Sequence, residues 1–528
     1  MSYSVVWFKR DLRLHDHAAL QAAAARGPLL CLYVVEPALW REPDAARQHY
    51  EFILESLREL YRALRQLGGR LHLVTGDVVE VLDRLHTAAP FGALFAHEET
   101  DNGLTFQRDL AVGRWCRAHG VQWQEFPQFG VVRRLANRDT WQARWEALMA
   151  QPCLPAPQEL RFAPLPWPDA PPPAADALGL AAHDPPRRQP GGRSHGLDVL
   201  HDFLDERSAQ YRGGISSPLS APTACSRLSP YLAFGCLSLR EIVHAARLKS
   251  ATLPASASRH KAGISAFISR LYWHCHFIQK LESEPELEFR NLHRGYDGMR
   301  EEDWNPRHFD ALAAGRTGWP LVDACVLMLR ETGWINFRMR AMLVSVAAYP
   351  LWLHWRSVGL WLARQFLDYE PGIHWSQMQM QSGTTGINVP RIYNPIKQAR
   401  DHDPHGHFVR RWLPALRRVP DSWLFEPWRM PTDVQARHGL QPGDIAEPPV
   451  DLETATRAAK ARLFALRAQP GVRAAKAAIV QKHGSRKRMP STSRGKKAAS
   501  PNQPRNGSWT RPMVRPGGWM ARSDNAAG

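Results

Sequence analysis

Hydrophobic and polar residues recur with different periods in the two halves of the chain. In the first 135 residues, short continuous apolar runs are separated by segments whose apolar positions recur at helix spacing. Apolar runs of this length between helices indicate buried parallel strands, so we predict a doubly wound α/β domain over residues 1–135. The runs lie at residues 4–8, 29–35, 71–74 and 92–96, and the helix-spaced segments lie at 47–67 and 106–118.

The rest of the pattern is helical. From about residue 196 to 467, apolar positions recur every three to four residues, which predicts an all-α domain over 196–467. A stretch rich in Pro, Ala and Gly at 151–192 precedes it, so we predict an interdomain linker over 136–195. The predicted helices lie at 197–211, 238–249, 258–282, 320–331, 337–348 and 358–366.

The composition is that of a water-soluble globular protein, with 44% hydrophobic residues in 528. The longest apolar run, 341–355, contains Pro350 and His354 and is too short to span a bilayer, so it predicts a buried helix. The first residues lack the basic start of a signal peptide, and seven cysteines without a Cys-x-x-Cys pair argue against disulfides and a zinc site. We therefore expect a reduced, cytoplasmic monomer with no metal and no membrane segment.

Positive charge is concentrated at the carboxy terminus. The net charge is +18, and residues 471–528 carry 13 Lys or Arg against the single Asp524, a net +12 that leaves +6 for the rest. A segment this polar has too little apolar surface to fold alone, so we predict a disordered basic tail over 468–528. It is either a solvated extension or a salt-sensitive arm that speeds encounters with a polyanion such as DNA, and both can hold.

Two groups of residues carry candidate chemistry. Residues 225–229 (Cys-Ser-Arg-Leu-Ser) supply hydroxyls, a guanidinium and a turn that opens a helix, which suits a phosphate but also an ordinary Ser N-cap. Arg340 and Asp368 both lie in apolar surroundings. Unpaired buried charges are costly, so we expect these two side chains to form a salt bridge, either beside a ligand or as a core ion pair.

Three ordered blocks resemble the photolyase/cryptochrome family. The resemblance covers roughly residues 4–465 and implies an FAD cofactor in the helical half. Independently, no Gly-rich fingerprint follows the first predicted strand, which argues against a standard NAD site. The blocks are Trp7-Phe8-Lys9-Arg10-Asp11-Leu12-Arg13-Leu14, residues 217–235 with Cys225-Ser226-Arg227-Leu228-Ser229-Pro230-Tyr231, and residues 333–412 with Gly333-Trp334-Ile335-Asn336-Phe337-Arg338-Met339-Arg340 and Asp368-Tyr369-Glu370.

The resemblance assigns the flavin contacts. Residues 225–229 correspond to the phosphate-holding segment, Arg340 and Asp368 to the pair beside flavin N5, and Glu370 to a second carboxylate near the ring. His374 stands where the family usually has Asn or Cys, and it is either a proton donor or relay for the flavin or a satisfied structural histidine. The residues implied to bind the cofactor are Tyr211, Cys225, Ser226, Arg227, Leu228, Ser229, Phe267, Arg270, His274, Phe337, Arg340, Asp368, Tyr369, Glu370 and His374.

The chain departs from the family in its electron-transfer residues. Of the three tryptophans that commonly reduce the flavin, only the middle one matches, at Trp355, while the proximal and distal positions fall on Met378 and near Leu312. Neither side chain carries single electrons readily. Other tryptophans, including Trp375, either supply a different route or belong to a Trp-rich core.

The lesion contacts are also altered. Trp273 matches a tryptophan that stacks on a cyclobutane dimer, Met380 replaces a second one, and Arg270 replaces a dimer-binding Glu. Phe337 stands where animal (6-4) photolyases place a catalytic His, which argues against that activity. Cys325 is the last cysteine, which excludes the iron–sulfur branch. The catalytic residues implied are Trp273, His374, Trp355 and Met380, and the DNA-binding residues are Arg338, Trp273, Lys397 and Arg400.

The resemblance also implies an activity and a second chromophore. We expect FAD-dependent, blue-light-driven repair of cyclobutane pyrimidine dimers in DNA, or alternatively a cryptochrome-like photoreceptor without repair; repair of another lesion or of single-stranded DNA is a third reading. Residues 9–11 and 97–101 lie where the family cradles an antenna of folate or flavin type, and Glu99 could hydrogen-bond a pterin.

Overall fold

The amino-terminal half is built on a parallel sheet. The computed structural model describes residues 3–165 and 171–485. Five parallel strands lie in the order β3-β2-β1-β4-β5, so the strand order reverses direction at the β1/β4 pair. The strands are β1 (Ser4–Phe8), β2 (Leu29–Val35), β3 (Leu71–Thr75), β4 (Ala93–His97) and β5 (Gln122–Phe126). The four predicted apolar runs are therefore strands, and the predicted fold class is confirmed.

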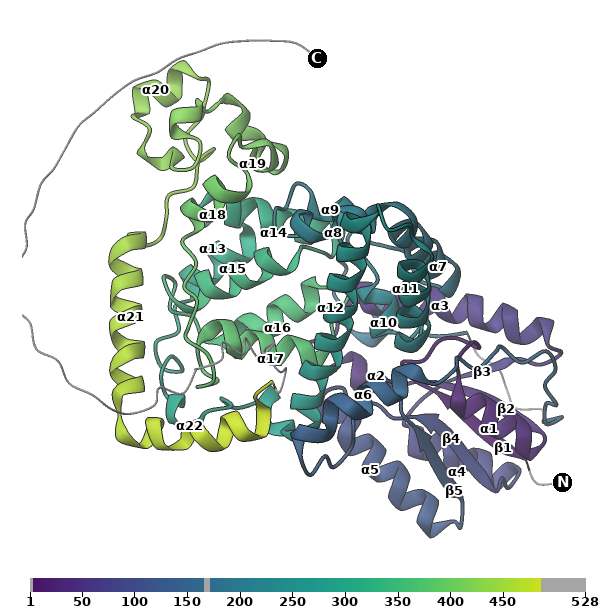
Figure 1. Ribbon diagram of the computed structural model, residues 1–528. Coiled ribbons are helices and arrows are strands. Elements are labelled where there is room, and N and C mark those ends of the chain that lie inside the picture. The colour runs from purple at the N-terminus through teal and green to yellow at the C-terminus, as the bar shows by residue number, and fades with distance from the viewer. Residues whose placement is uncertain (1–2, 166–170, 486–528) are drawn as a thin grey trace, which may run out of the picture. The chain divides into compact units, whose positions relative to one another are not determined.

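Helices cover both faces of the sheet (Figure 1). Apolar residues of α1 and α3 pack with one face, and those of α4 and α5 pack with the other. This two-sided burial explains why the central strands are continuous apolar runs. The sequence of β5, Gln-Trp-Gln-Glu-Phe, has no such run because β5 is a partly exposed edge strand, and we did not predict it. The helices of this half are α1 (Ala18–Arg26), α2 (Pro37–Trp40), α3 (Arg47–Gln66), α4 (Val78–Ala88), α5 (Gly103–Ala118) and α6 (Trp141–Ala150).

The carboxy-terminal half is helical, as predicted. Helix α12 is the longest, and it packs against both α8 and α17. The helices are α7 (Arg193–Asp202), α8 (Ser208–Gly214), α9 (Ala221–Ala224), α10 (Ser229–Ala233), α11 (Leu239–Thr252), α12 (Ser258–Ser283), α13 (Pro306–Ala314), α14 (Pro320–Thr332), α15 (Phe337–Ala348), α16 (Trp355–Gln365), α17 (Pro371–Ser382), α18 (Pro395–His402), α19 (His407–Trp412), α20 (Thr432–Arg437), α21 (Leu452–Ala468) and α22 (Pro470–His483).

The structure differs from the prediction in two segments. Residues 341–355 are not one helix, because α15 ends at Ala348 and the chain turns through Pro350 and Trp352 (φ 52°) before α16. Part of the segment that we predicted to be disordered is a helix, because α22 occupies Pro470–His483 and buries Val472 against Gly295. The rest of the predicted tail, residues 486–528, lies outside the described residues.

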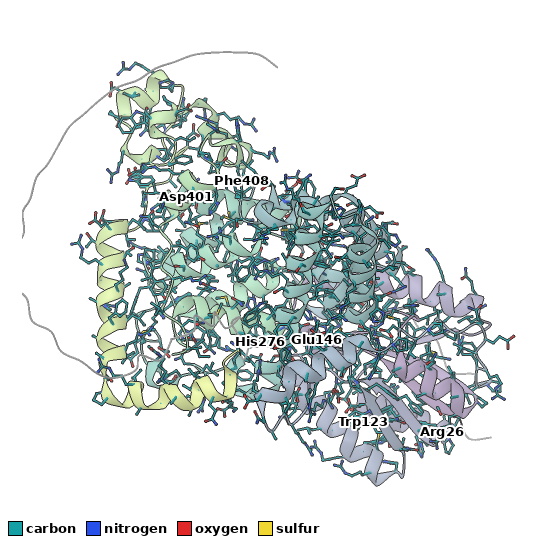
Figure 2. The ribbon with its side chains drawn as sticks, in the orientation of Figure 1. Arg26, Trp123, Glu146, His276, Asp401 and Phe408 are labelled. Atoms are coloured by element: carbon teal, nitrogen blue, oxygen red, sulfur yellow. The ribbon has the colours of Figure 1, made fainter. Side chains whose placement is uncertain are left out.

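The predicted linker contains ordered structure. Helix α6 buries Trp141 and Trp145, and Trp141 packs on Tyr272 of α12 with ring centroids 5.0 Å apart. Figure 2 labels Glu146 on α6 and His276 on α12 in this region. The domain boundaries themselves stay a prediction. Within the described residues, no helix is both long and apolar enough to cross a membrane. All seven cysteines are free thiols.

Candidate flavin site

The phosphate segment has a backbone conformation that suits an anion. Arg227 has a positive φ of 60°, and Leu228 follows in a helical conformation at φ −91° and ψ −8°. A left-handed residue next to a right-handed one turns successive N–H groups toward one point, the arrangement called a nest. The Arg227 guanidinium lies over the Trp334 ring, 3.9 Å from its centroid. The predicted segment therefore combines converging amides with a nearby cation.

Arg340 and Asp368 pair as expected. Two guanidinium nitrogens of Arg340 each lie 3.0 Å from an Asp368 oxygen, and its Nε donates to the Ile335 carbonyl at 2.8 Å. The guanidinium also covers the Phe366 ring at 4.2 Å. Burial would raise the pKa of Asp368, but Arg340 and a hydrogen bond from Ser229 hold it below its ordinary value. Asp368 is therefore an anion at neutral pH.

The Ser229 contact joins the two predicted elements. Its hydroxyl bonds the same carboxylate that pairs with Arg340, so the phosphate segment and the ion pair form one constellation. Amides and a guanidinium at one end suit a pyrophosphate, and the Arg–Asp couple at the other supplies a donor and an acceptor to a heteroaromatic edge. The residues present fit FAD.

A hydrogen bond fixes which ring nitrogen of His374 carries the proton. Its Nε2 lies 2.9 Å from the Gly359 carbonyl, and a carbonyl can only accept, so Nε2 carries the proton. Burial lowers the pKa of His374 to about 3, so the ring is neutral at physiological pH. Only Nδ1 is left, as an acceptor. The structure thus favours the structural reading of His374 over a proton donor.

The remaining predicted flavin contacts are divided. Tyr211 packs edge-on against Phe267 at 5.9 Å and bonds Arg270, so these three lie together. His274 instead packs on Phe129 of the amino-terminal half at 4.9 Å. Phe337 is 56% exposed, so the structure does not support it as part of a buried flavin pocket. The position of Phe337 in the sequence block does not show whether its side chain points into the protein or toward solvent.

A row of aromatic rings leads away from His374. Its ring centroid lies 4.8 Å from that of Trp375, and Trp375 lies 5.9 Å from Trp355. Gly359 makes room for Trp375, because a Cβ there would come within 2.5 Å of the indole. Met378 and Leu312, which stand at or near the proximal and distal tryptophan positions of the family, are both buried. The structure therefore connects Trp355 to the site through Trp375.

Trp273 and Met380 are the candidate lesion contacts. Trp273 is half-buried on α12, where it packs on His276 at 4.8 Å and on Phe277 at 5.8 Å. Met380 is half-buried near the end of α17. The two helices pack closely, since a Cβ on Gly372 would lie 2.6 Å from the Ile278 backbone.

A cavity opens in the amino-terminal half where the strand order reverses. It contains about 800 Å³ of empty space, including its opening to solvent, and lies beyond the carboxyl ends of β1 and β2. Ligands of open α/β sheets bind at such switch points. Aromatic rings of Trp7, Tyr33 and Trp40 line it, and Tyr369 reaches it from the helical half. The Lys9-Arg10 and Glu99 positions predicted to cradle an antenna line this cavity, whereas Asp11 lines a second, smaller one with Glu370.

Sequence reasoning missed several residues of this cavity, notably Glu36 and Arg108. Arg108 contacts Glu36 at 3.0 Å and Glu99 at 2.5 Å, and it covers the Trp7 ring at 4.9 Å. Burial raises the pKa of Glu36 to about 7, although Arg108 opposes the shift. Glu36 could have been found from its place directly after the second apolar run, because ligands of parallel sheets bind beyond the carboxyl ends of the strands.

Asp11, His17 and His97 form a buried cluster with the composition of a metal site. Asp11 Oδ2 lies 3.0 Å from Nε2 of His17 and 2.7 Å from Nδ1 of His97. However, Nδ1 of His17 accepts the backbone N–H of Leu20, so Nε2 must carry the ring proton and has no lone pair for a metal. The cluster is a structural hydrogen-bond network.

Comparison with known proteins agrees with this geometry. Residues 4–134 match the family model described as DNA photolyase, and residues 267–465 match the FAD binding domain of DNA photolyase. The cryptochrome DASH of Gloeobacter violaceus is 30% identical over 85% of this chain and 93% of its own length. The deoxyribodipyrimidine photo-lyase of Streptomyces griseus is 30% identical over 86% of this chain and 98% of its own.

Solved structures give the same result. A class III photolyase from Agrobacterium tumefaciens superposes with a TM-score of 0.77 at 26% identity, covering 89% of this chain and 98% of that one. A cryptochrome from Synechocystis gives a TM-score of 0.78 at 23% identity, covering 87% and 99%, a likeness of fold alone. Proteins named for repair and proteins named as cryptochromes thus match about equally well.

Proposed function

Because the chain belongs to the DNA photolyase/cryptochrome family and carries its FAD-binding domain, we propose that it is a blue-light-driven DNA repair enzyme for cyclobutane pyrimidine dimers. Reduced FAD, when bound and excited, supplies the electron that splits the cyclobutane ring. The chain's own residues hold the cofactor, receive the flipped dinucleotide and exclude water.

Trp273 is the observation that carries the repair proposal. It is half-buried, so one face of the indole can receive a base, and its ring is braced by His276 and Phe277. It lies on α12, the helix that also carries Phe267 and Arg270 of the flavin site. Stacking on one aromatic ring contributes roughly 1–3 kcal/mol per base, which offsets part of the cost of extruding a dinucleotide from the duplex.

The DNA backbone would be met by basic residues near the start of α15 and along α18. Arg338 lies close enough to His402 to help lower its pKa, behind the larger effect of burial. Lys397 pairs with Asp401, labelled in Figure 2, and Arg400 pairs with Glu426. All four groups are at least partly exposed, so these pairs are weak and can exchange for phosphates.

A photoreceptor without repair activity is the second candidate. Arg270 favours it, because a cation stands where dimer-repairing relatives are expected to place a carboxylate, and its side chain bonds Tyr211. For either role we propose that the switch-point cavity holds an antenna of folate or flavin type, and that the protein works as a cytoplasmic monomer.

A repair assay separates the two candidates. Purified, reduced protein is illuminated with blue light in the presence of an oligonucleotide that carries one cyclobutane dimer, and restored thymines are counted by chromatography. We expect light-dependent repair that Trp273→Phe lowers roughly tenfold, the equivalent of about 1.4 kcal/mol. The matched control Trp304→Phe changes a partly exposed tryptophan that packs on Phe309 and should keep full activity. Normal FAD content without turnover would favour the photoreceptor.

A further inference from the structure

We propose that Arg207 and Gln189 are positioning residues for the phosphate segment, a role that rests on the proposed flavin site. Neither belongs to the segment. Arg207 ends a π-helical turn (Phe203–Arg207) between α7 and α8, and Gln189 lies in the predicted linker. Together they hold three consecutive carbonyls of the segment and so fix the direction of its amides.

Arg207 holds the first two carbonyls. Its Nη1 donates to the Cys225 carbonyl, and its Nη2 donates to the Ser226 carbonyl at 3.4 Å. The side chain is fixed in turn by Asp202, 2.5 Å from Nε, and by the Phe203 ring, 5.5 Å from the guanidinium carbon. A π-helical turn inserts one extra residue per turn and often marks a functional site. Here it directs Arg207 at the segment.

Gln189 holds the third carbonyl and the side chain of the same residue. Its Nε2 donates to the Arg227 carbonyl at 2.9 Å, and its Oε1 accepts from the Arg227 guanidinium at 3.0 and 3.2 Å. This two-way contact stabilises Arg227 in the left-handed conformation, which is unfavourable for a residue other than glycine. The linker is anchored beside it, because Arg188 forms a two-point ion pair with Glu55 of α3.

Fixing the carbonyls exposes the amides. In a planar trans peptide, the C=O of one residue and the N–H of the next point in opposite directions. Carbonyls of residues 225–227 that face Arg207 and Gln189 therefore turn the N–H groups of residues 226–228 the other way. Within the described part of the chain, none of these three N–H groups donates to another protein atom. They are free to receive the pyrophosphate of FAD.

Ligands that contain different parts of FAD test the role. Flavin-free, full-length protein is titrated with FAD, ADP and riboflavin, since ADP carries the pyrophosphate without the flavin ring and riboflavin carries the ring without phosphate. In Gln189→Met and Arg207→Met we expect affinity for FAD and ADP to fall about tenfold, the equivalent of 1.4 kcal/mol, with riboflavin affinity and melting temperature unchanged. Arg207→Lys, which can still reach one carbonyl, should lie in between.

The controls remove similar contacts elsewhere on the surface. Gln151→Met loses a hydrogen bond to Arg240, and Arg247→Met loses a pair with Glu146, and both should bind all three ligands normally. If riboflavin affinity falls as much as ADP affinity, or if no affinity changes, the positioning role is wrong. If wild-type protein binds neither FAD nor ADP, the flavin site itself is wrong. Should Arg207→Met fail to fold, Gln189→Met decides alone.

Discussion

The phosphate segment and the switch-point cavity use charge in opposite ways. In the segment, Arg207 and Gln189 donate hydrogen bonds to the carbonyls, and three backbone N–H groups have no partner among the described residues. In the cavity, Arg108 is bonded to Glu36, Glu99 and Asp109, and Lys9 to Asp109. A site that keeps its donors free is suited to an anion. A site whose cations already have carboxylate partners must recognise its ligand mainly by shape and aromatic stacking.

Breaking the Arg340–Asp368 pair should have the largest effect. Arg340→Met leaves Asp368, whose side chain is only 6% exposed, as a buried anion without its cation. We expect about 3 kcal/mol of lost stability and loss of bound FAD, measured by urea unfolding and absorbance. Because the pair holds the pKa of Asp368 below its ordinary value, its stabilisation is present above about pH 4 and is lost as the pH falls further.

A double variant separates stability from binding. Arg340→Met combined with Asp368→Asn removes both charges, so most of the stability should return while FAD remains absent. Arg364→Met, which loses only a bond to the Pro43 carbonyl, is the control and should retain both. A yellow Arg340→Met protein would show that the pair belongs to the core and not to the cofactor site.

Neutralising Glu36 tests the switch-point cavity. The folded pKa of about 7 lies above the ordinary value, so wild-type protein loses stability as the pH rises from about 4.5 to 7. Glu36→Gln does not titrate, so it should equal wild type at pH 4 and exceed it by about 3 kcal/mol at pH 8. Glu159→Gln, on an exposed loop, should show no such difference. An identical pH profile for Glu36→Gln and wild type would mean that Arg108 fully compensates the burial.

The end of the chain holds cations with almost no acidic partners. Residues 486–528 contain ten Lys or Arg and one acid. Their sequence therefore offers almost no carboxylates to pair with these cations, unlike the switch-point cavity. Deleting them, while keeping α22, should weaken binding to duplex DNA roughly tenfold and reduce the slope of log K against log salt by about 2. FAD content should not change. An unaltered slope would show that these charges make no contact with DNA.

The sequence predicted the fold and the central pair because both follow from strong local signals. Apolar runs bounded by helices predicted four strands, and two charges in apolar surroundings predicted the Arg340–Asp368 bridge. The edge strand β5 was missed because a half-exposed strand has no apolar run. Helix α22 was missed because its sequence is basic and its stability comes from tertiary contacts such as the bond from His293 to the Val472 carbonyl.

The supporting residues could not be predicted for a different reason. Arg207 and Gln189 lie 18 and 38 residues from the carbonyls of Cys225 and Arg227 that they hold. Neither lies in a recognisable sequence pattern, and an Arg or Gln at such a position is ordinarily a solvated surface residue. Likewise, position alone gave His374 two readings, and only its bond to the Gly359 carbonyl distinguished them.

We expect the smallest effect on electron transfer to the cofactor. The two tryptophans on the proposed route differ in whether the indole N–H is hydrogen-bonded. The buried Nε1 of Trp375 has no hydrogen-bond partner among the described residues, whereas that of Trp355 donates to Asn291 at 2.8 Å. Donation to a carbonyl oxygen stabilises an oxidised indole, so a positive charge on Trp375 should move to Trp355. We expect Trp355→Phe and Trp375→Phe each to slow photoreduction of the bound cofactor about fivefold, roughly 1 kcal/mol, and Asn291→Leu to slow it less. Trp361→Phe, whose ring packs on Phe309 instead, is the control. A normal rate in Trp375→Phe would mean that electrons reach the site by a path that avoids these two rings.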